Sequence, residues 1–285
     1  MNFRRLIVGL TLGWLALFVL LPHLLVLLTS VLSPDSQSLA AYPFTLESYA
    51  RLWQPIYAQA FWQSLWLAGL TTLICLLIGY PFAWILSRMP PLRRALTLFM
   101  VMLPFWTNSL IRTYAIKLIL GNKGLLNTLL LGLGLTDAPL QLLYTPFAVV
   151  FGLVYILLPF MVLPLVAAFD KLDPRLLEAA RDLGAGLRQR FTEVVLPLTL
   201  PGAIAGSLIV FLPAMGMFYV ADLLGGARNL LLGNIVKNQF LVVRDWPFGA
   251  ALSVTLIALM GLLLWLYARA NARIHRRGGI HDSTP

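Results

Sequence analysis

Six apolar runs, each near the length that crosses a lipid bilayer, constrain the fold of this chain more than any other feature. A helix needs about 20 apolar residues to span the hydrocarbon core. Of the 285 residues, 60% are hydrophobic and only 11% are charged, which is too little charge to cover a water-soluble domain. We therefore predict an all-α integral membrane protein with six transmembrane helices. The runs are Leu6–Leu32, Phe61–Leu86, Ala95–Leu120, Phe147–Phe169, Pro201–Ala221 and Phe248–Tyr267.

The orientation of these spans follows from the lysine and arginine residues that flank them. The first run is too long for a signal-peptide core, and no small-residue cleavage site follows it, so we interpret it as a retained helix. One set of flanks carries fourteen lysine and arginine residues, whereas the opposite set carries five. Because positively charged loops stay in the cytoplasm, and six spans return the chain to its starting side, both termini are predicted to be cytoplasmic.

The connection between the fourth and fifth runs, residues 170–200, is polar and carries helix start and stop signals. Asp173 is a suitable N-cap, and Pro174 fits the first helical position. Gly184 suits a left-handed residue that ends a helix. We therefore predict a short helix over Pro174–Leu183.

A second amphipathic segment follows at Leu187–Leu196, and Pro197 is expected to end it. The pair Pro201-Gly202 then leads into the fifth apolar run. The connection is thus predicted to form a compact helix-turn-helix on the cytoplasmic face.

This connection contains the spaced motif Glu178-Ala179-Ala180, Gly184, Val194 and Leu196-Pro197. The motif resembles the EAA loop of ATP-binding cassette (ABC) importer permeases, although that family usually has isoleucine where Val194 stands. The resemblance implies a type I ABC importer permease fold, with a coupling helix that docks into a groove of a separate ATPase. Charges beside the turn can fix the register of such a contact. The residues assigned to the ATPase contact are Glu178, Ala179, Ala180, Arg181, Asp182, Gly184, Leu196 and Pro197.

The alternative for this loop is an interfacial helix pair whose arginines touch anionic headgroups. The sequence contains no Gly-x-x-x-x-Gly-Lys-Ser/Thr phosphate loop, so the chain is not expected to be an enzyme. ATP and magnesium are expected in the partner ATPase, and no cofactor is expected in this chain. One cysteine and three scattered histidines indicate no metal site and no catalytic constellation.

Four further strings resemble the permease subunits of bacterial spermidine/putrescine importers. The resemblance implies a second homologous permease, two copies of an ATPase and a periplasmic polyamine-binding protein, all acting at the bacterial inner membrane. It divides the chain into an N-terminal helix and outer loop (1–60), an ABC transmembrane type-1 domain (61–267) with its coupling loop (170–200), and a basic cytoplasmic tail (268–285). The strings are Gly79–Trp84, Pro104–Arg112, Leu212–Asp222 and Arg244–Gly249.

A path for a flexible chain of ammonium groups should offer carboxylates, carbonyls and aromatic faces. Pro104 interrupts the third run, and Pro213 with Gly216 interrupts the fifth. Broken helices free carbonyl groups that can face a cation. The candidate pathway residues near these breaks and at the outer face are Trp106, Asn108, Tyr114, Tyr219, Asp222 and Asp245.

Each group of candidates has a structural alternative. Asp222 and Asp245 would instead be solvated groups near Arg228 and Arg244. Trp106 would instead be part of ordinary helix packing. The sequence alone leaves these alternatives open.

Arg112 and Lys117 are the two cations inside an apolar run. We predict that both snorkel into lipid headgroups, because they lie near the outer end of their span. The alternative functions are a related type I ABC importer permease for an amino acid, ferric ion or sulfate, and a secondary transporter. A secondary transporter would often show inverted repeats and buried ionisable residues at the midplane, and neither is evident in the sequence.

Overall fold

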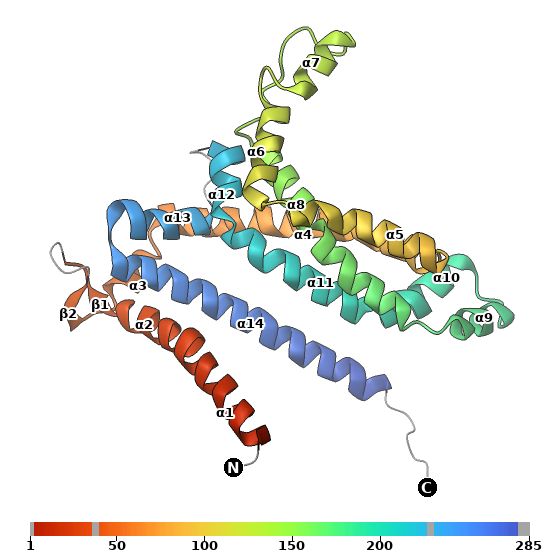
Figure 1. The fold of residues 1–285 in the computed structure, drawn as a ribbon, viewed down its shortest axis with the longest axis horizontal. Coiled ribbons are helices and arrows are strands. Elements are labelled where there is room, and N and C mark those ends of the chain that lie inside the picture. The colour runs from red at the N-terminus through yellow and green to blue at the C-terminus, as the bar shows by residue number, and fades with distance from the viewer. Residues whose placement is uncertain (1–2, 36–39, 227–230, 279–285) are drawn as a thin grey trace. The chain divides into compact units, whose positions relative to one another are not determined.

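The computed structural model describes residues 3–35, 40–226 and 231–278 (Figure 1). The chain forms two compact units. The first unit comprises Met1–Trp62 and Leu232–Gly261, and the second comprises Gln63–Leu231 and Leu262–Pro285. The helices α4 (Pro55–Ser87) and α14 (Trp246–Gly278) each contribute to both units. The end of the predicted basic tail, residues 279–285, lies outside the described residues.

The described residues contain five helices that are long and apolar enough to cross a membrane. The segments Pro91–Trp106 and Ser109–Gly132 are also long and apolar enough together, but they meet at an angle of 91°, so the number of crossings is six only if this bent pair counts as one span. The predicted all-α membrane fold is therefore confirmed with five or six spans, and the predicted third span is a sharply bent pair of helices rather than one straight helix. The five continuous spans are Arg5–Thr29, Pro55–Ser87, Pro146–Asp170, Leu187–Gly216 and Trp246–Arg269.

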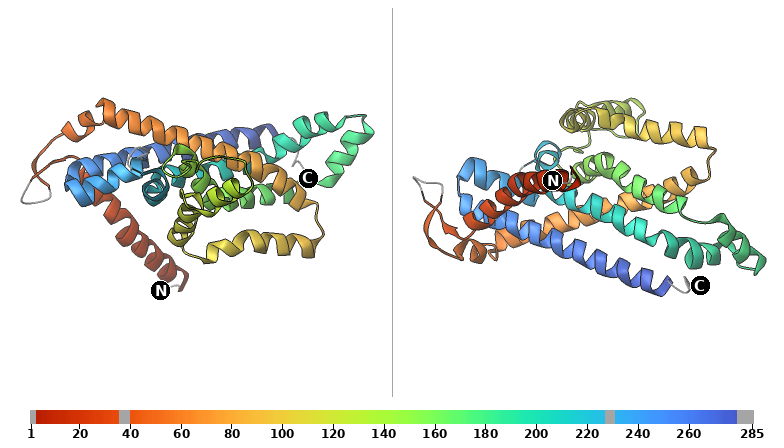
Figure 2. Two further views of the ribbon diagram at one scale, coloured as in Figure 1. Left: turned by 90° about the horizontal axis from the view of Figure 1, so that it is seen from above. Right: turned by 60° about the horizontal axis from the view of Figure 1, so that its bottom comes forward.

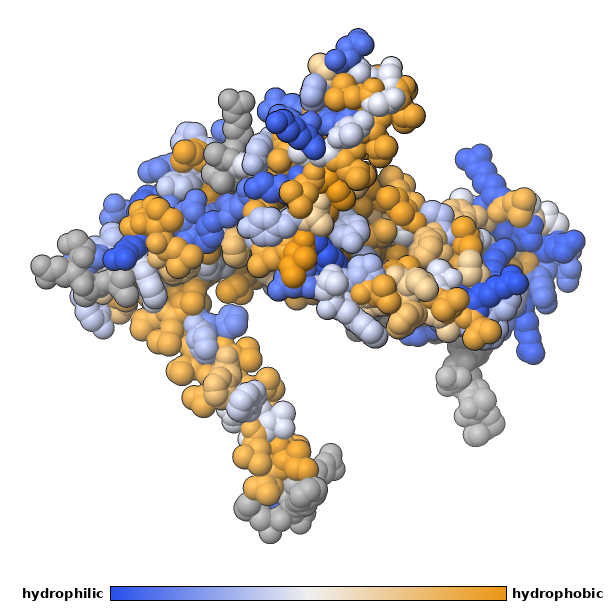
Figure 3. Space-filling view, turned by 45° about the horizontal axis from the view of Figure 1, so that its top comes forward, coloured by the Kyte–Doolittle hydropathy of each residue, from blue (hydrophilic) through white to orange (hydrophobic). Residues whose placement is uncertain are grey.

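The first unit begins with a long apolar helix whose hydrophobic window has no buried side chain. Its apolar side chains surround the whole helix, which is the pattern of a helix that lies in lipid (Figure 3). A short antiparallel hairpin follows and pairs Leu32 with Phe44. The elements of this unit, besides parts of α4 and α14, are α1 (Phe3–Leu15), η1 (Ala16–Leu20), α2 (Leu21–Thr29), β1 (Leu32–Ser33), β2 (Ala41–Phe44), α3 (Glu47–Arg51), α13 (Leu232–Asn238) and η6 (Gln239–Val243).

The second unit is organised around two helices, α8 and α11, that pack side by side (Figures 1 and 2). Small residues bring the two backbones close together, as is usual between membrane helices. An added Cβ at Gly206, for example, would lie 3.2 Å from the carbonyl oxygen of Met161. The elements are α5 (Pro91–Met102), η2 (Leu103–Trp106), α6 (Ser109–Leu120), α7 (Leu125–Gly132), α8 (Pro146–Asp170), α9 (Pro174–Asp182), α10 (Leu187–Arg190), η3 (Phe191–Val195), α11 (Leu196–Gly216), α12 (Phe218–Val220) and η4 (Ala221–Gly225).

The second helix predicted for residues 170–200 does not end at Pro197, contrary to the prediction from the sequence. The helical path runs without a break from Leu187 to Gly216, through both Pro197 and Pro201. A π-helical turn, η3, ends at Val195, two residues before Pro197. This wider turn changes the hydrogen-bond register at the point where a proline would otherwise clash with the preceding turn, so the helix continues into the membrane.

Candidate functional site

The coupling loop, residues 170–200, begins with a capped helix whose boundaries match the sequence signals closely. The Asp173 carboxylate accepts a hydrogen bond from the backbone N–H of Arg175 at 2.9 Å, and α9 starts at Pro174. At the other end, Gly184 has φ +81°. The N–H groups of Gly184 and Ala185 donate to the carbonyls of Arg181 and Ala180, both at 2.9 Å. These two bonds form a Schellman motif, so the turn requires a residue that tolerates the left-handed region.

The turn after α9 exposes two large apolar side chains beside the small residue. Leu183 is 88% exposed and Leu187 is 81% exposed. A Cβ at Gly184 would meet nothing within 4 Å, so the space around the turn is open in this chain. Hydrophilic side chains gather over α9 and α10 in Figure 3, and Glu178, Arg181 and Asp182 are exposed there. Neither leucine is among the residues predicted to contact the ATPase, and their exposure marks a surface suited to a protein partner.

An aromatic cluster links the coupling loop to two membrane helices. Phe191, in η3, lies edge-on to Tyr80 and Trp84 of α4, with ring centroids 5.9 and 6.5 Å apart. Phe169 of α8 contacts the same two rings at 5.2 and 5.4 Å. The Tyr80 hydroxyl also shares a hydrogen bond of 2.7 Å with the buried Thr199 hydroxyl of α11. A displacement of the loop would therefore act directly on α4, α8 and α11.

The break in the third span lies between η2 and α6, as the position of Pro104 predicted. Thr107 is extended, with φ −91° and ψ 148°, and Asn108 caps α6 by accepting a hydrogen bond from the Leu110 N–H at 2.8 Å. Trp106 is 79% exposed, and its ring lies edge-on to Phe99 at 5.7 Å. Trp106 thus presents most of its indole outside the chain's own packing.

The break in the fifth span follows Gly216, where Met217 has φ −73° and ψ 68°. Beyond it lie Tyr219, which is half-buried, and Asp222, which is exposed. The segments after this break, α12 and η4, pack against α6. The structure therefore brings the continuations of the two broken spans together, with Tyr114 exposed on α6.

Asp245 lies in the first unit, where it forms an ion pair with Arg51 at 2.6 Å. Its other carboxylate oxygen accepts a hydrogen bond from the Phe248 N–H at 3.1 Å, at the start of α14. The Arg51 guanidinium also lies 4.2 Å from the centre of the Phe248 ring. Burial alone would lower the pKa of Arg51, but Asp245 and, to a smaller extent, Tyr57 together outweigh it through hydrogen bonds and charge and raise the pKa. Asp245 thus holds a loop to a helix end in this conformation.

Arg112 does not extend outward to lipid headgroups, contrary to the prediction from the sequence. Its side chain is buried, and its guanidinium lies 4.6 Å from the centre of the Phe105 ring. Lys117, one and a half turns further along α6, is half-buried and lies 5.9 Å from the Tyr144 ring. Sequence reasoning could not find the burial of Arg112, because it depends on how α6 packs after the bend.

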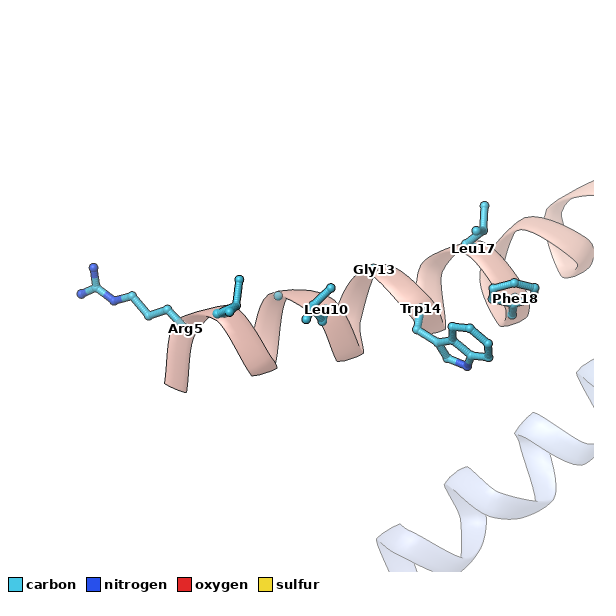
Figure 4. A pocket seen from close by; sticks show the side chains of 8 residues that line it. Arg5, Leu10, Gly13, Trp14, Leu17 and Phe18 are labelled. Atoms are coloured by element: carbon cyan, nitrogen blue, oxygen red, sulfur yellow. The ribbon is translucent and has the colours of Figure 1, made fainter. Parts of the chain in front are cut away.

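Two surface depressions of the chain are large enough to hold part of a ligand. One, of about 550 Å³, follows α1 and η1 and is lined only by residues of these elements, mostly apolar (Figure 4). Gly9 and Gly13 lower the helix surface there, which suits an acyl chain or a neighbouring helix better than a polar solute. The other, of about 470 Å³, lies beside Tyr114, Lys117 and Lys123. Its two lysines would repel a cation.

The residues 75–276 match the family of binding-protein-dependent transport system inner membrane components. The spermidine/putrescine transport system permease protein PotB of Haemophilus influenzae is 57% identical over 276 residues, which is 97% of this chain and 96% of that protein. PotB of Escherichia coli is 55% identical over 265 residues, covering 93% and 96% of the two chains. The inner membrane ABC transporter permease protein YdcU of Escherichia coli is 34% identical over 242 residues, or 80% and 76%.

Among solved structures, the chain resembles a bacterial alginate ABC transporter crystallised with an alginate pentasaccharide-bound periplasmic protein. The TM-score is 0.77 at 17% identity, over 95% of this chain and 94% of the other. At this identity the likeness concerns the fold alone. It agrees with the type I permease fold that the coupling-loop motif implied.

Proposed function

We propose that this chain, which belongs to the family of binding-protein-dependent transport system inner membrane components, is the permease subunit of an ATP-driven importer of polyamines. The observation that carries the proposal is the 57% identity to a spermidine/putrescine permease over 97% of the chain. The chain is a non-catalytic subunit of the bacterial inner membrane. Its termini face the cytoplasm in this proposal, because the basic flanks include those of both ends.

The assembly in this proposal contains a second homologous permease, two ATPase copies and a periplasmic polyamine-binding protein. The ATPases bind ATP and magnesium, and their closure moves α9. The contact is made by Glu178, Arg181 and Asp182 together with the exposed Leu183 and Leu187. The aromatic cluster around Tyr80 then transmits the movement to the membrane helices, which alternate between outward and inward openings.

The polyamine path in this proposal follows the two broken spans. The exposed indole of Trp106 and the side chains of Tyr114 and Tyr219 offer faces that attract ammonium groups. Asn108 and Asp222 add oxygen atoms that accept hydrogen bonds from the same groups. Asp245 contributes to the outer entrance in this proposal, where the cargo replaces Arg51 as the partner of its carboxylate.

The transport proposal is tested with the purified four-component complex in lipid vesicles. We expect ATP-dependent accumulation of radiolabelled spermidine that unlabelled putrescine reduces and that amino acids, ferric ion and sulfate leave unchanged. Omission of the binding protein or of ATP serves as the control. Accumulation of an amino acid, ferric ion or sulfate in place of spermidine would assign the permease to a related importer.

Replacement of Trp106 by alanine is expected to slow spermidine uptake by about three- to tenfold, the size of one lost cation–π contact. The matched control is Trp66→Ala, because Trp66 is also an exposed tryptophan, at 63%, but belongs to the unbroken helix α4. Both variants should assemble with the ATPase to the same extent, which co-purification measures. Equal uptake by the two variants would remove Trp106 from the path.

A further inference from the structure

Arg112 carries a buried charge for which the known role of a permease gives no reason. Its side chain is 8% exposed, and among the described residues its Nε and Nη1 atoms have no hydrogen-bond partner. Unpaired charges inside membrane spans are costly and usually mark functional positions. Arg112 also lies in the first turn of α6, where the helix dipole disfavours a cation.

The contact that holds this charge is the face of Phe105. The guanidinium carbon lies 4.6 Å from the ring centre. Phe105 belongs to η2, just before the break in the third span, and Arg112 follows one turn after the break. Phe105 is itself fixed by an edge contact with Phe160 of α8 at 5.2 Å. The contact between Arg112 and Phe105 therefore connects the two sides of the break.

An aromatic face beside freed backbone carbonyls is the kind of site that an ammonium group would occupy. In this structure the guanidinium of the chain itself covers that face. An entering polyamine must displace this tethered cation, and it also meets a fixed charge of its own sign in a medium that screens charge weakly. Both effects oppose passage of polyamine when no energy is supplied.

We propose that Arg112 is a tethered competitor of the cargo, which occupies the Phe105 face at rest and limits the unassisted passage of polyamines through the break. This inference rests on the proposed function, because it takes the cargo to be a polyamine. Since repulsion grows with the number of ammonium groups, Arg112 restrains spermidine more strongly than putrescine. Arg112 thus determines the specificity between polyamines and does not serve a purely structural role.

The experiment measures efflux of radiolabelled spermidine, without ATP, from vesicles that contain the complete complex and were preloaded with the polyamine. Arg112→Gln is expected to raise this leak about tenfold, the effect of removing one interaction of moderate strength between charges. Arg112→Lys, which keeps the charge, should stay near the wild-type leak. The matched control is Lys117→Gln, which removes a cation from the same helix at a half-buried position 5.9 Å from its ring.

A second readout separates this role from a purely structural one. The ratio of spermidine leak to putrescine leak should rise in Arg112→Gln and stay unchanged in Lys117→Gln. Phe105→Leu leaves the charge but removes the ring that holds it, so its leak should also rise. Combining Phe105→Leu with Arg112→Gln should add little to either change, because both act on one contact.

The outcomes distinguish this inference from the proposed function. If the wild-type complex accumulates spermidine with ATP, but the Arg112→Gln leak equals that of Lys117→Gln, the inference is wrong and the function stands. Should Arg112→Gln fail to assemble, Phe105→Leu decides, and a wild-type leak in that variant overturns the inference. Failure of the wild-type complex to accumulate spermidine would refute the polyamine proposal itself.

Discussion

Replacing Gly184 by valine is expected to abolish ATP-driven uptake while the chain still inserts into the membrane. Gly184 has φ +81°, and a β-branched residue cannot take that conformation without strain of roughly 1–3 kcal/mol or more. The strain opens the Schellman turn and moves the end of α9, with Leu183 and Leu187, out of register. The loss should exceed tenfold in uptake, and ATP hydrolysis should no longer respond to the loaded binding protein.

The control for this prediction lies two residues further along. Gly186 also has open space around it, but its φ of −68° and ψ of 169° suit any residue. Gly186→Val therefore adds the same bulk without backbone strain and should retain most of the transport. Gly184→Asn should recover part of the activity, because asparagine tolerates the left-handed region better than valine. Equal uptake by Gly184→Val and Gly186→Val would contradict the role given to the turn.

The capped helix α9 could be predicted from the sequence because its signals are local. Asp173, Pro174 and Gly184 each act on backbone groups within a few residues of themselves, so their meaning depends little on tertiary structure. The break at Pro104 is local for the same reason. Its 91° bend is not, because the angle depends on where α6 packs after it leaves α5.

Other features lay beyond sequence reasoning because they join distant residues. Asp245 meets Arg51 across 194 positions, and no pattern around either residue indicates this partner. The burial of Arg112 depends on Phe105 and on the packing of α8 behind that ring. The unbroken path through Pro197 depends on a π-helical turn, which propensity does not reveal. Local chemistry thus predicted the structure of the loop at residues 170–200 better than the interior of the candidate path.

Replacing Gly202 by valine is expected to prevent stable folding of the second unit, the other large effect that the structure predicts. A Cβ at Gly202 would overlap the Cβ of Ala168 and lie 2.9 Å from the carbonyl oxygen of Pro164. Because part of this obstacle is backbone, α8 and α11 would have to move apart. Overpacking of this kind costs typically 1–3 kcal/mol, and valine adds three carbon atoms where one already overlaps, so we expect the upper part of that range or more.

The measurement is the thermal stability of the complex in detergent, together with the amount of chain that co-purifies with the ATPase. Gly261→Val makes the matched control, because Gly261 is exposed on α14 and a Cβ there meets nothing within 4 Å. Both variants replace a glycine of a membrane helix by valine. The difference between their melting temperatures therefore reports the contact between α8 and α11. If Gly202→Val melts at the same temperature as Gly261→Val, the stability of the second unit does not depend on the close approach of α8 and α11.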